Sequence, residues 1–91
     1  MKDLRTNKTT KLYIIVEDTC EDGNNDIDTF IFDDKETARK RFKSLVSEDK
    51  KFLVEEGRDD VIEESANSYC SFPEGEYGIT HYWVSLSETN A

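Results

Sequence analysis

The chain has 91 residues, of which 36% are charged, and a formal net charge of −9. This length accommodates one domain with a single core and excludes a second domain. The negative charge argues against direct binding to nucleic acid or to anionic membranes, because both rely on Lys and Arg side chains. The charge is also sorted along the chain: residues 17–34 contain eight acidic residues and no basic one, residues 35–51 seven basic and three acidic, and residues 52–91 nine acidic and Arg58 alone.

The N-terminal segment is polar and basic. Residues 1–10 have no apolar stretch, so we predict a flexible basic tail there rather than a signal peptide. The longest apolar run, residues 12–16, is far shorter than the ~20 residues that cross a bilayer. We therefore predict a cytoplasmic protein that does not bind membranes, with one α+β domain over residues 11–88 and a disordered C-terminus at residues 89–91.

The first half of the chain predicts a hairpin followed by a helix. Residues 11–18 carry apolar side chains on both faces of a strand, the Asp-, Gly- and Asn-rich residues 19–26 favour a turn, and residues 27–33 return as a second strand. A capping-box pattern and apolar residues at three- and four-residue steps then predict a helix over residues 34–56, ending at Gly57. Asp49 interrupts the apolar stripe and leaves the continuity of this helix open.

The second half predicts strands at residues 61–72 and 79–86, joined by a loop rich in Pro and Gly. The predicted fold is α+β, a four-stranded antiparallel sheet in ββαββ order with one long helix packed on one face. One helix covers only one face of a sheet, yet these strands are apolar on both. We therefore predict an exposed face containing Tyr13, Tyr69 and Trp83, which could bind a partner or form a homodimer.

Residues with catalytic chemistry are few. His81 is the only histidine, and Cys20 and Cys70 are too far apart in sequence for a Cys-x-x-Cys redox pair. The chain contains neither a glycine-rich phosphate loop nor a set of metal ligands at a known spacing, so we predict no catalytic residue, no cofactor and no metal. The alternative is a small-molecule-binding domain or minimal enzyme that uses the aromatic sheet face with His81 and Cys70.

The acidic residues are the strongest functional candidates. We predict a non-catalytic interaction protein that docks on a basic protein surface, such as that of a nucleic-acid-handling enzyme. Alternate strand residues repeat about every 6.6 Å, of the same order as backbone phosphates, so a sharper hypothesis is a nucleic-acid mimic. In size and charge the chain resembles small acidic inhibitors encoded by phages and mobile elements. The predicted partner-binding residues are Glu17, Asp18, Glu21, Asp22, Asp26, Asp28, Glu55, Glu56, Asp59, Asp60, Glu63 and Glu64.

Overall fold

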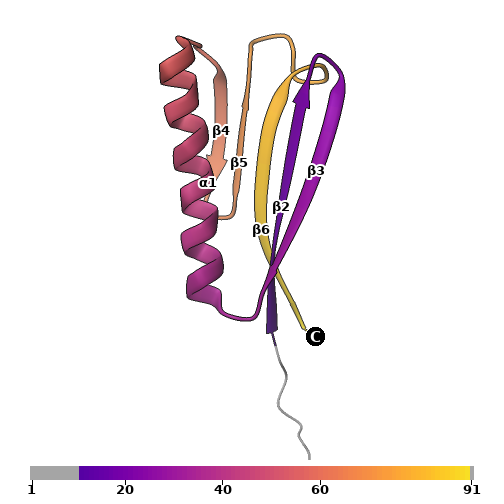
Figure 1. Cartoon of the computed structure of the whole chain (residues 1–91), viewed down its shortest axis with the longest axis vertical. Coiled ribbons are helices and arrows are strands. Elements are labelled where there is room, and N and C mark those ends of the chain that lie inside the picture. Colours follow the sequence, from indigo (N-terminus) through magenta and orange to yellow (C-terminus); the bar gives the residue numbers. More distant parts are fainter. Residues whose placement is uncertain (1–10, 91) are drawn as a thin grey trace, which may run out of the picture.

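The computed structural model describes residues 11–90, which form one helix and a five-stranded antiparallel sheet (Figure 1). The elements are β2 (Lys11–Glu21), β3 (Asn24–Phe32), α1 (Lys35–Glu56), β4 (Val61–Ser65), β5 (Ser68–Phe72) and β6 (His81–Asn90). The sheet order is β3-β2-β6-β5-β4, so the N-terminal hairpin pairs with the C-terminal strand. The predicted α+β class is confirmed, but the sheet has five strands instead of four.

The additional strand comes from residues 61–72, which we predicted as one strand. The segment folds back on itself between β4 and β5, around Ala66 and Asn67. Arg39 of α1 donates a hydrogen bond to the Ala66 carbonyl oxygen at 2.7 Å, and the Leu86 amide donates to the Asn67 carbonyl oxygen at 2.8 Å. Contacts from α1 and β6 therefore stabilise a turn that contains neither Gly nor Pro.

The last strand begins and ends later than predicted. It covers His81–Asn90, so Thr89 and Asn90 pair with β2 and are not disordered. Ile79 lies instead in the loop before β6, where its amide donates to the Glu76 carbonyl oxygen at 2.9 Å. The predicted basic tail at residues 1–10 and the last residue, Ala91, lie outside the described residues.

The helix α1 is continuous over its 22 residues. Asp34 caps its N-terminus by accepting hydrogen bonds from the backbone amide and hydroxyl of Thr37, at 2.8 and 2.6 Å. These bonds lower the pKa of the Asp34 carboxyl. At the C-terminus Gly57 adopts the left-handed conformation (φ 67°), as the sequence predicts. Within residues 11–90, no helix combines the length and the apolar character required to cross a membrane.

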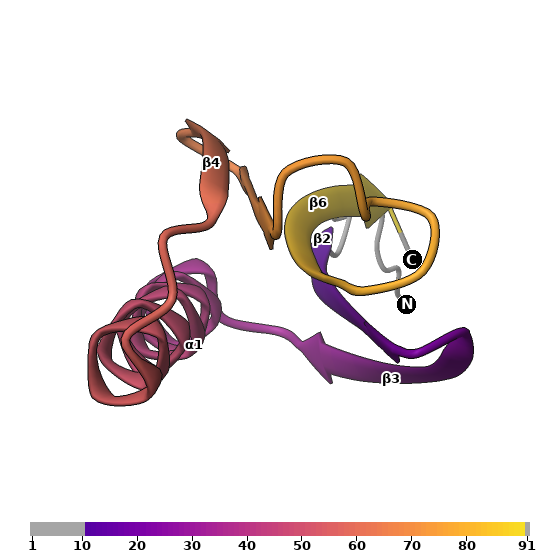
Figure 2. The same cartoon turned by 90° about the horizontal axis from the view of Figure 1, so that it is seen from above.

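The hydrophobic core lies between α1 and one face of the sheet. Seen from above, the sheet curves from β4 round to β3, and α1 lies on its inner side (Figure 2). We call this the helix side of the sheet and the opposite one the outer face. Strand side chains alternate between the two faces, so each residue's face follows from the register. The core residues are Ile15, Ala38, Phe42, Leu45, Val46, Tyr69, Val84 and Leu86.

We predict that Gly57→Ala lowers the free energy of unfolding by about 1 kcal/mol, because an L side chain disfavours the left-handed conformation. Open space surrounds the position of the added methyl group, so backbone strain is the expected cause. Gly78→Ala is the matched control, since Gly78 also has open space but no positive φ. Urea denaturation measures both variants, and equal effects would contradict the left-handed cap.

Candidate functional site

Four connecting segments meet at one end of the molecule, and acidic residues are concentrated in them. These are the β2–β3 turn, the C-terminus of α1, the α1–β4 connection and the β5–β6 loop (Figure 1). The Gly23 amide donates to the Ile79 carbonyl oxygen at 2.8 Å, and the Asp22 amide to the Thr80 hydroxyl at 3.3 Å, so turn and loop are bonded together. We call this region the acidic end. Its carboxylates belong to Glu21, Asp22, Glu55, Glu56, Asp59, Asp60, Glu74 and Glu76.

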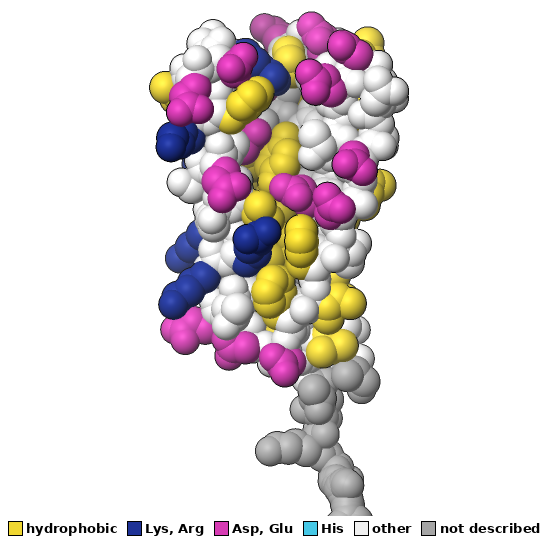
Figure 3. Space-filling view, viewed as in Figure 1, with side chains coloured by type: hydrophobic (Ala, Val, Ile, Leu, Met, Phe, Trp, Pro, Cys, Tyr) yellow, Lys and Arg dark blue, Asp and Glu magenta, His cyan; other side chains and the backbone are white. Residues whose placement is uncertain are grey.

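The helix terminus adds to this negative charge. The last turn of α1 contains no basic residue, and the negative end of the helix dipole lies there. The space-filling view shows several acidic side chains at this end, with others along the middle and at the opposite end of the same face (Figure 3). The acidic end therefore combines side-chain charges and backbone dipoles of the same sign.

Arg58 is the only basic residue within these segments, and it is already paired. Its guanidinium donates two hydrogen bonds to Asp60, from Nε at 3.1 Å and from Nη2 at 2.7 Å. These hydrogen bonds raise the pKa of Arg58. The Asp60 side chain is only 2% exposed, so this ion pair neutralises a carboxylate that would otherwise be buried unpaired. Arg58 consequently leaves the other carboxylates of the acidic end uncompensated.

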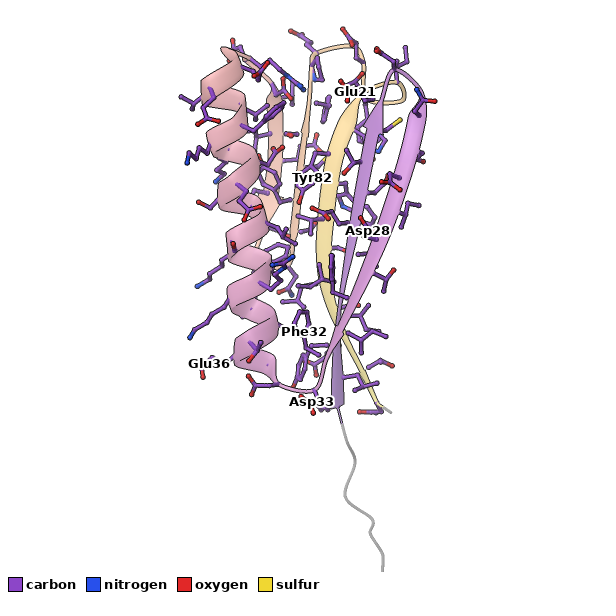
Figure 4. All side chains as sticks on the ribbon, viewed as in Figure 1. Glu21, Asp28, Phe32, Asp33, Glu36 and Tyr82 are labelled. Carbon is purple, nitrogen blue, oxygen red and sulfur yellow. The ribbon has the colours of Figure 1, made fainter. Side chains whose placement is uncertain are left out.

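A cleft of about 270 Å³ opens between the C-terminal half of α1 and strands β2 and β6. Its lining includes Glu21, Asp49, Phe52 and Tyr82. Tyr82 lies between β6 and α1 (Figure 4), and its hydroxyl donates to the Glu17 carboxylate at 2.6 Å. Burial raises the pKa of Tyr82, and the hydrogen bond to Glu17 raises it further. The cleft thus adjoins the acidic end on the helix side of the sheet, and its lining also includes Arg58.

Asp49, which lines this cleft, connects α1 to the sheet. Its Oδ2 accepts hydrogen bonds from the hydroxyls of Tyr69 and Ser71, both at 2.7 Å. Tyr69 is fully buried and Ser71 is 1% exposed, so both hydroxyls require a partner inside the protein. Burial raises the pKa of Tyr69, with a further contribution from Asp49. An acidic residue in the apolar stripe is therefore a structural anchor and not a helix break.

The acidic residues of the β2–β3 hairpin divide between the two faces of the sheet. Alternation places Glu17, Glu21, Asp26 and Asp28 on the helix side. Asp18 lies on the outer face, where its carboxylate accepts a hydrogen bond from the Asn25 side-chain amide. Four of the predicted partner-binding residues in this hairpin therefore share one face with the cleft.

The predicted partner-binding residues of β4, Glu63 and Glu64, also lie on opposite faces of the sheet. Glu64 on β4 forms an ion pair with Lys50 of α1 at 2.9 Å, whereas Glu63 lies on the outer face beside Cys70. The sequence analysis missed Glu74 and Glu76, which lie in the β5–β6 loop at the acidic end. The sequence signal that could have identified them is their position next to Pro73 and Gly75, which places both carboxylates in an exposed loop between two strands.

Two of the three aromatic residues predicted on the exposed face were misplaced. Tyr69 is completely buried in the core, and Tyr13 packs against that core. The error has a simple cause: β2 is apolar on both faces, and the structure buries Ile15 while Ile14 lies on the outer face. Trp83 does lie on the outer face, where its Nε1–H donates to the Ser68 hydroxyl at 3.4 Å.

The outer face of the sheet carries both apolar and polar side chains, and one end of it is covered. The β5–β6 loop packs over the end nearest the acidic end, where the Tyr77 ring stacks on the imidazole of His81 with a centroid separation of 4.8 Å. Farther along β3, Ile27 and Ile31 are 60% and 64% exposed. The exposed part of this face therefore includes the sheet edge formed by β3.

Cys70 and His81 lack the geometry of a nucleophile and its base. Burial raises the pKa of the Cys70 thiol to about 11, which keeps it protonated near neutral pH. His81 Nδ1 faces the Tyr77 carbonyl oxygen at 2.6 Å, and Nε2 faces the Asp18 carboxylate at 3.4 Å. Within the described residues no hydrogen bond joins the Cys70 thiol to the His81 imidazole, and no group of His, Cys, Asp and Glu side chains is placed to hold a metal ion.

Comparison with known protein families found no matching family, and comparisons with curated proteins and with solved structures found no similar protein. The functional argument therefore depends on the geometry and charge of residues 11–90. The acidic residues were candidates in the sequence, and the structure adds their assembly at one end and the adjoining cleft.

We predict that Tyr69 and Tyr82 remain protonated at about pH 11, because burial and hydrogen bonds to carboxylates raise both pKa values above the ordinary ~10. These raised values stabilise the folded chain below about pH 10, and the contribution is lost as the pH increases beyond that. Ultraviolet absorbance measures phenolate formation, with circular dichroism to verify folding. Tyr82→Phe should leave the phenolate absorbance at about pH 11 unchanged; a decrease would show that Tyr82 ionises normally.

Proposed function

We propose that this protein is a non-catalytic interaction protein whose acidic end and cleft dock on a basic protein surface. The observation that supports the proposal is the convergence of eight carboxylates at one end. Within residues 11–90, the one arginine in these segments, Arg58, is already paired with one of the eight, Asp60. Carboxylates gathered in this way repel one another and lower the stability of the folded state. A basic partner would offset that repulsion, and its association would be accelerated by the negative field.

A nucleic-acid-handling protein is the basic partner that the arrangement fits best. Asp26 and Asp28 occupy alternate positions on the helix side of β3, and Glu17 lies opposite Asp28 on β2. Alternate strand residues are about 6.6 Å apart, so these carboxylates form a short regular row. A groove lined with Lys and Arg that normally contacts phosphates would accept such a row. The proposed activity is inhibition of that partner by occupying its groove.

The alternative, a small-molecule binder or minimal enzyme on the aromatic face, has less structural support. The Cys70 thiol is a weak nucleophile, and both ring nitrogens of His81 face oxygen atoms of the same chain. Tyr13 and Tyr69, the other aromatic residues of that hypothesis, belong to the helix side. The acidic docking surface therefore remains the preferred function.

We predict that Glu55→Lys combined with Asp59→Lys abolishes capture of the partner. Affinity capture from the source cells with the wild-type chain, followed by mass spectrometry, identifies the partner, which is then purified. Its affinity for the wild-type chain should decrease at least tenfold as salt increases from about 50 to 200 mM, and duplex DNA should displace it.

The matched control is Asp33→Lys combined with Glu36→Lys, which changes the net charge equally at the opposite end of the molecule from Glu21 (Figure 4). This control should retain the partner at low salt. Equal binding by both double variants, or binding that salt leaves unchanged, would show that the acidic end is not the docking surface.

A further inference from the structure

The strand β3 forms one edge of the sheet and is open along its length. It contains nine residues, and its ladder partner is β2. Among residues 11–90, no backbone hydrogen bond joins β3 to any element other than β2. An edge strand of this length presents unpaired N–H and C=O groups that can pair with a strand from another chain.

The hairpin geometry identifies which backbone groups point outward. Asp22 and Gly23 form a two-residue turn with positive φ at both positions (52° and 83°), which is the type I′ geometry. The flanking residues Glu21 and Asn24 then form a hydrogen-bonded pair, and every second residue of β3 after Asn24 does the same with β2. The residues between them direct their N–H and C=O groups away from the sheet; they are Asn25, Ile27, Thr29 and Ile31.

The side chains along this edge differ sharply between the two faces. On the outer face Ile27 and Ile31 are mostly exposed, at 60% and 64%. On the helix side Asp26 and Asp28 are exposed, and Glu17 lies beside Asp28 on β2. A strand added to this edge would place alternate side chains against isoleucines on one face and against carboxylates on the other.

We propose that β3 accepts an extended segment of the basic partner, in which basic and apolar residues alternate, as a sixth strand of the sheet. The basic residues lie over Asp26 and Asp28, and the apolar residues cover Ile27 and Ile31. Backbone hydrogen bonds to the outward groups of β3 supply affinity, and the alternation supplies specificity. This inference rests on the proposed function, because it specifies the part of the partner that binds.

A second copy of this chain fits the edge poorly. The antiparallel register that pairs all nine residues of β3 with themselves is centred on Asp28 and places the two Asp28 carboxylates opposite each other. Like charges directly opposite on neighbouring strands are destabilising. Each chain also carries a formal net charge of −9. Charge complementarity therefore selects a basic segment over a homodimer at this edge.

The test uses a capped peptide of alternating lysine and valine, matched in length to the nine residues of β3. A peptide of the same composition with its lysines and valines in separate blocks is the control, and it should bind at least tenfold more weakly. On binding of the alternating peptide, amide hydrogen exchange of Ile27, Thr29 and Ile31 should slow at least tenfold. Exchange protection reports backbone pairing, which nonspecific attraction between charges would not produce.

Thr29→Pro separates strand addition from charge attraction. It removes an outward N–H without removing a hydrogen bond to β2, and Thr29→Val is the control that retains the N–H. Thr29→Pro should weaken binding of the alternating peptide about tenfold, and Thr29→Val should leave it unchanged. Circular dichroism verifies that both variants fold.

Three results would overturn the inference. They are no binding of the alternating peptide, binding without protection of the outward amides, and equal binding by Thr29→Pro and the wild type. Protection that increases with protein concentration in the absence of peptide would instead indicate pairing with a second copy. None of these results removes the proposed function, which fails if both double variants bind the partner equally or if salt leaves its binding unchanged.

Discussion

Packing of α1 against the helix side of the sheet is the constraint on which the rest of the structure depends. The helix begins at the end of β3 and is 22 residues long, so its C-terminus reaches the level of the β2–β3 turn (Figure 1). Its apolar residues contact the sheet core, and Asp49 supplies the polar connection to Tyr69 and Ser71. This packing brings the C-terminus of α1 and the α1–β4 connection to the end where the β2–β3 turn and the β5–β6 loop are hydrogen-bonded to each other. The acidic end depends on this packing and on the pairing of β2 with β6.

The distribution of charge over the fold indicates where repulsion between carboxylates lowers the stability of the folded state. Two ion pairs, Arg58 with Asp60 and Lys50 with Glu64, neutralise carboxylates next to the helix. The carboxylates in the turns and at the helix terminus receive no such compensation from Arg58. Domains of this size have only a few kcal/mol of net stability, so concentrated repulsion is a considerable cost. A partner that neutralises the acidic end would offset it, which is the physical basis of the proposed function.

The parts of the fold that local chemistry determines could be predicted from the sequence. A turn within residues 19–26, the helix with its stop at Gly57 and the α+β class all follow from residue types with strong local preferences. The structure shortens that turn to Asp22 and Gly23, because β2 and β3 each extend three residues farther than predicted. The division of residues 61–72 into β4 and β5 could not be predicted in the same way, because Arg39 and Leu86 stabilise that turn from elsewhere in the chain. The sequence also did not show which face of the sheet carries Tyr13 and Tyr69. Strands that are apolar on both sides do not reveal which side the helix covers. For the candidate site, the acidic residues were evident, whereas their assembly at one end required the topology.

The most direct test of this account is the dependence of folding stability on salt. Screening weakens repulsion between exposed charges, so the free energy of unfolding of the wild type should increase as sodium chloride is added. Glu55→Gln combined with Asp59→Asn should reduce that slope, while Asp33→Asn combined with Glu36→Gln at the opposite end should change it less. A wild-type stability that does not increase with salt, or equal slopes for the two double variants, would contradict the claim that the acidic end carries uncompensated charge.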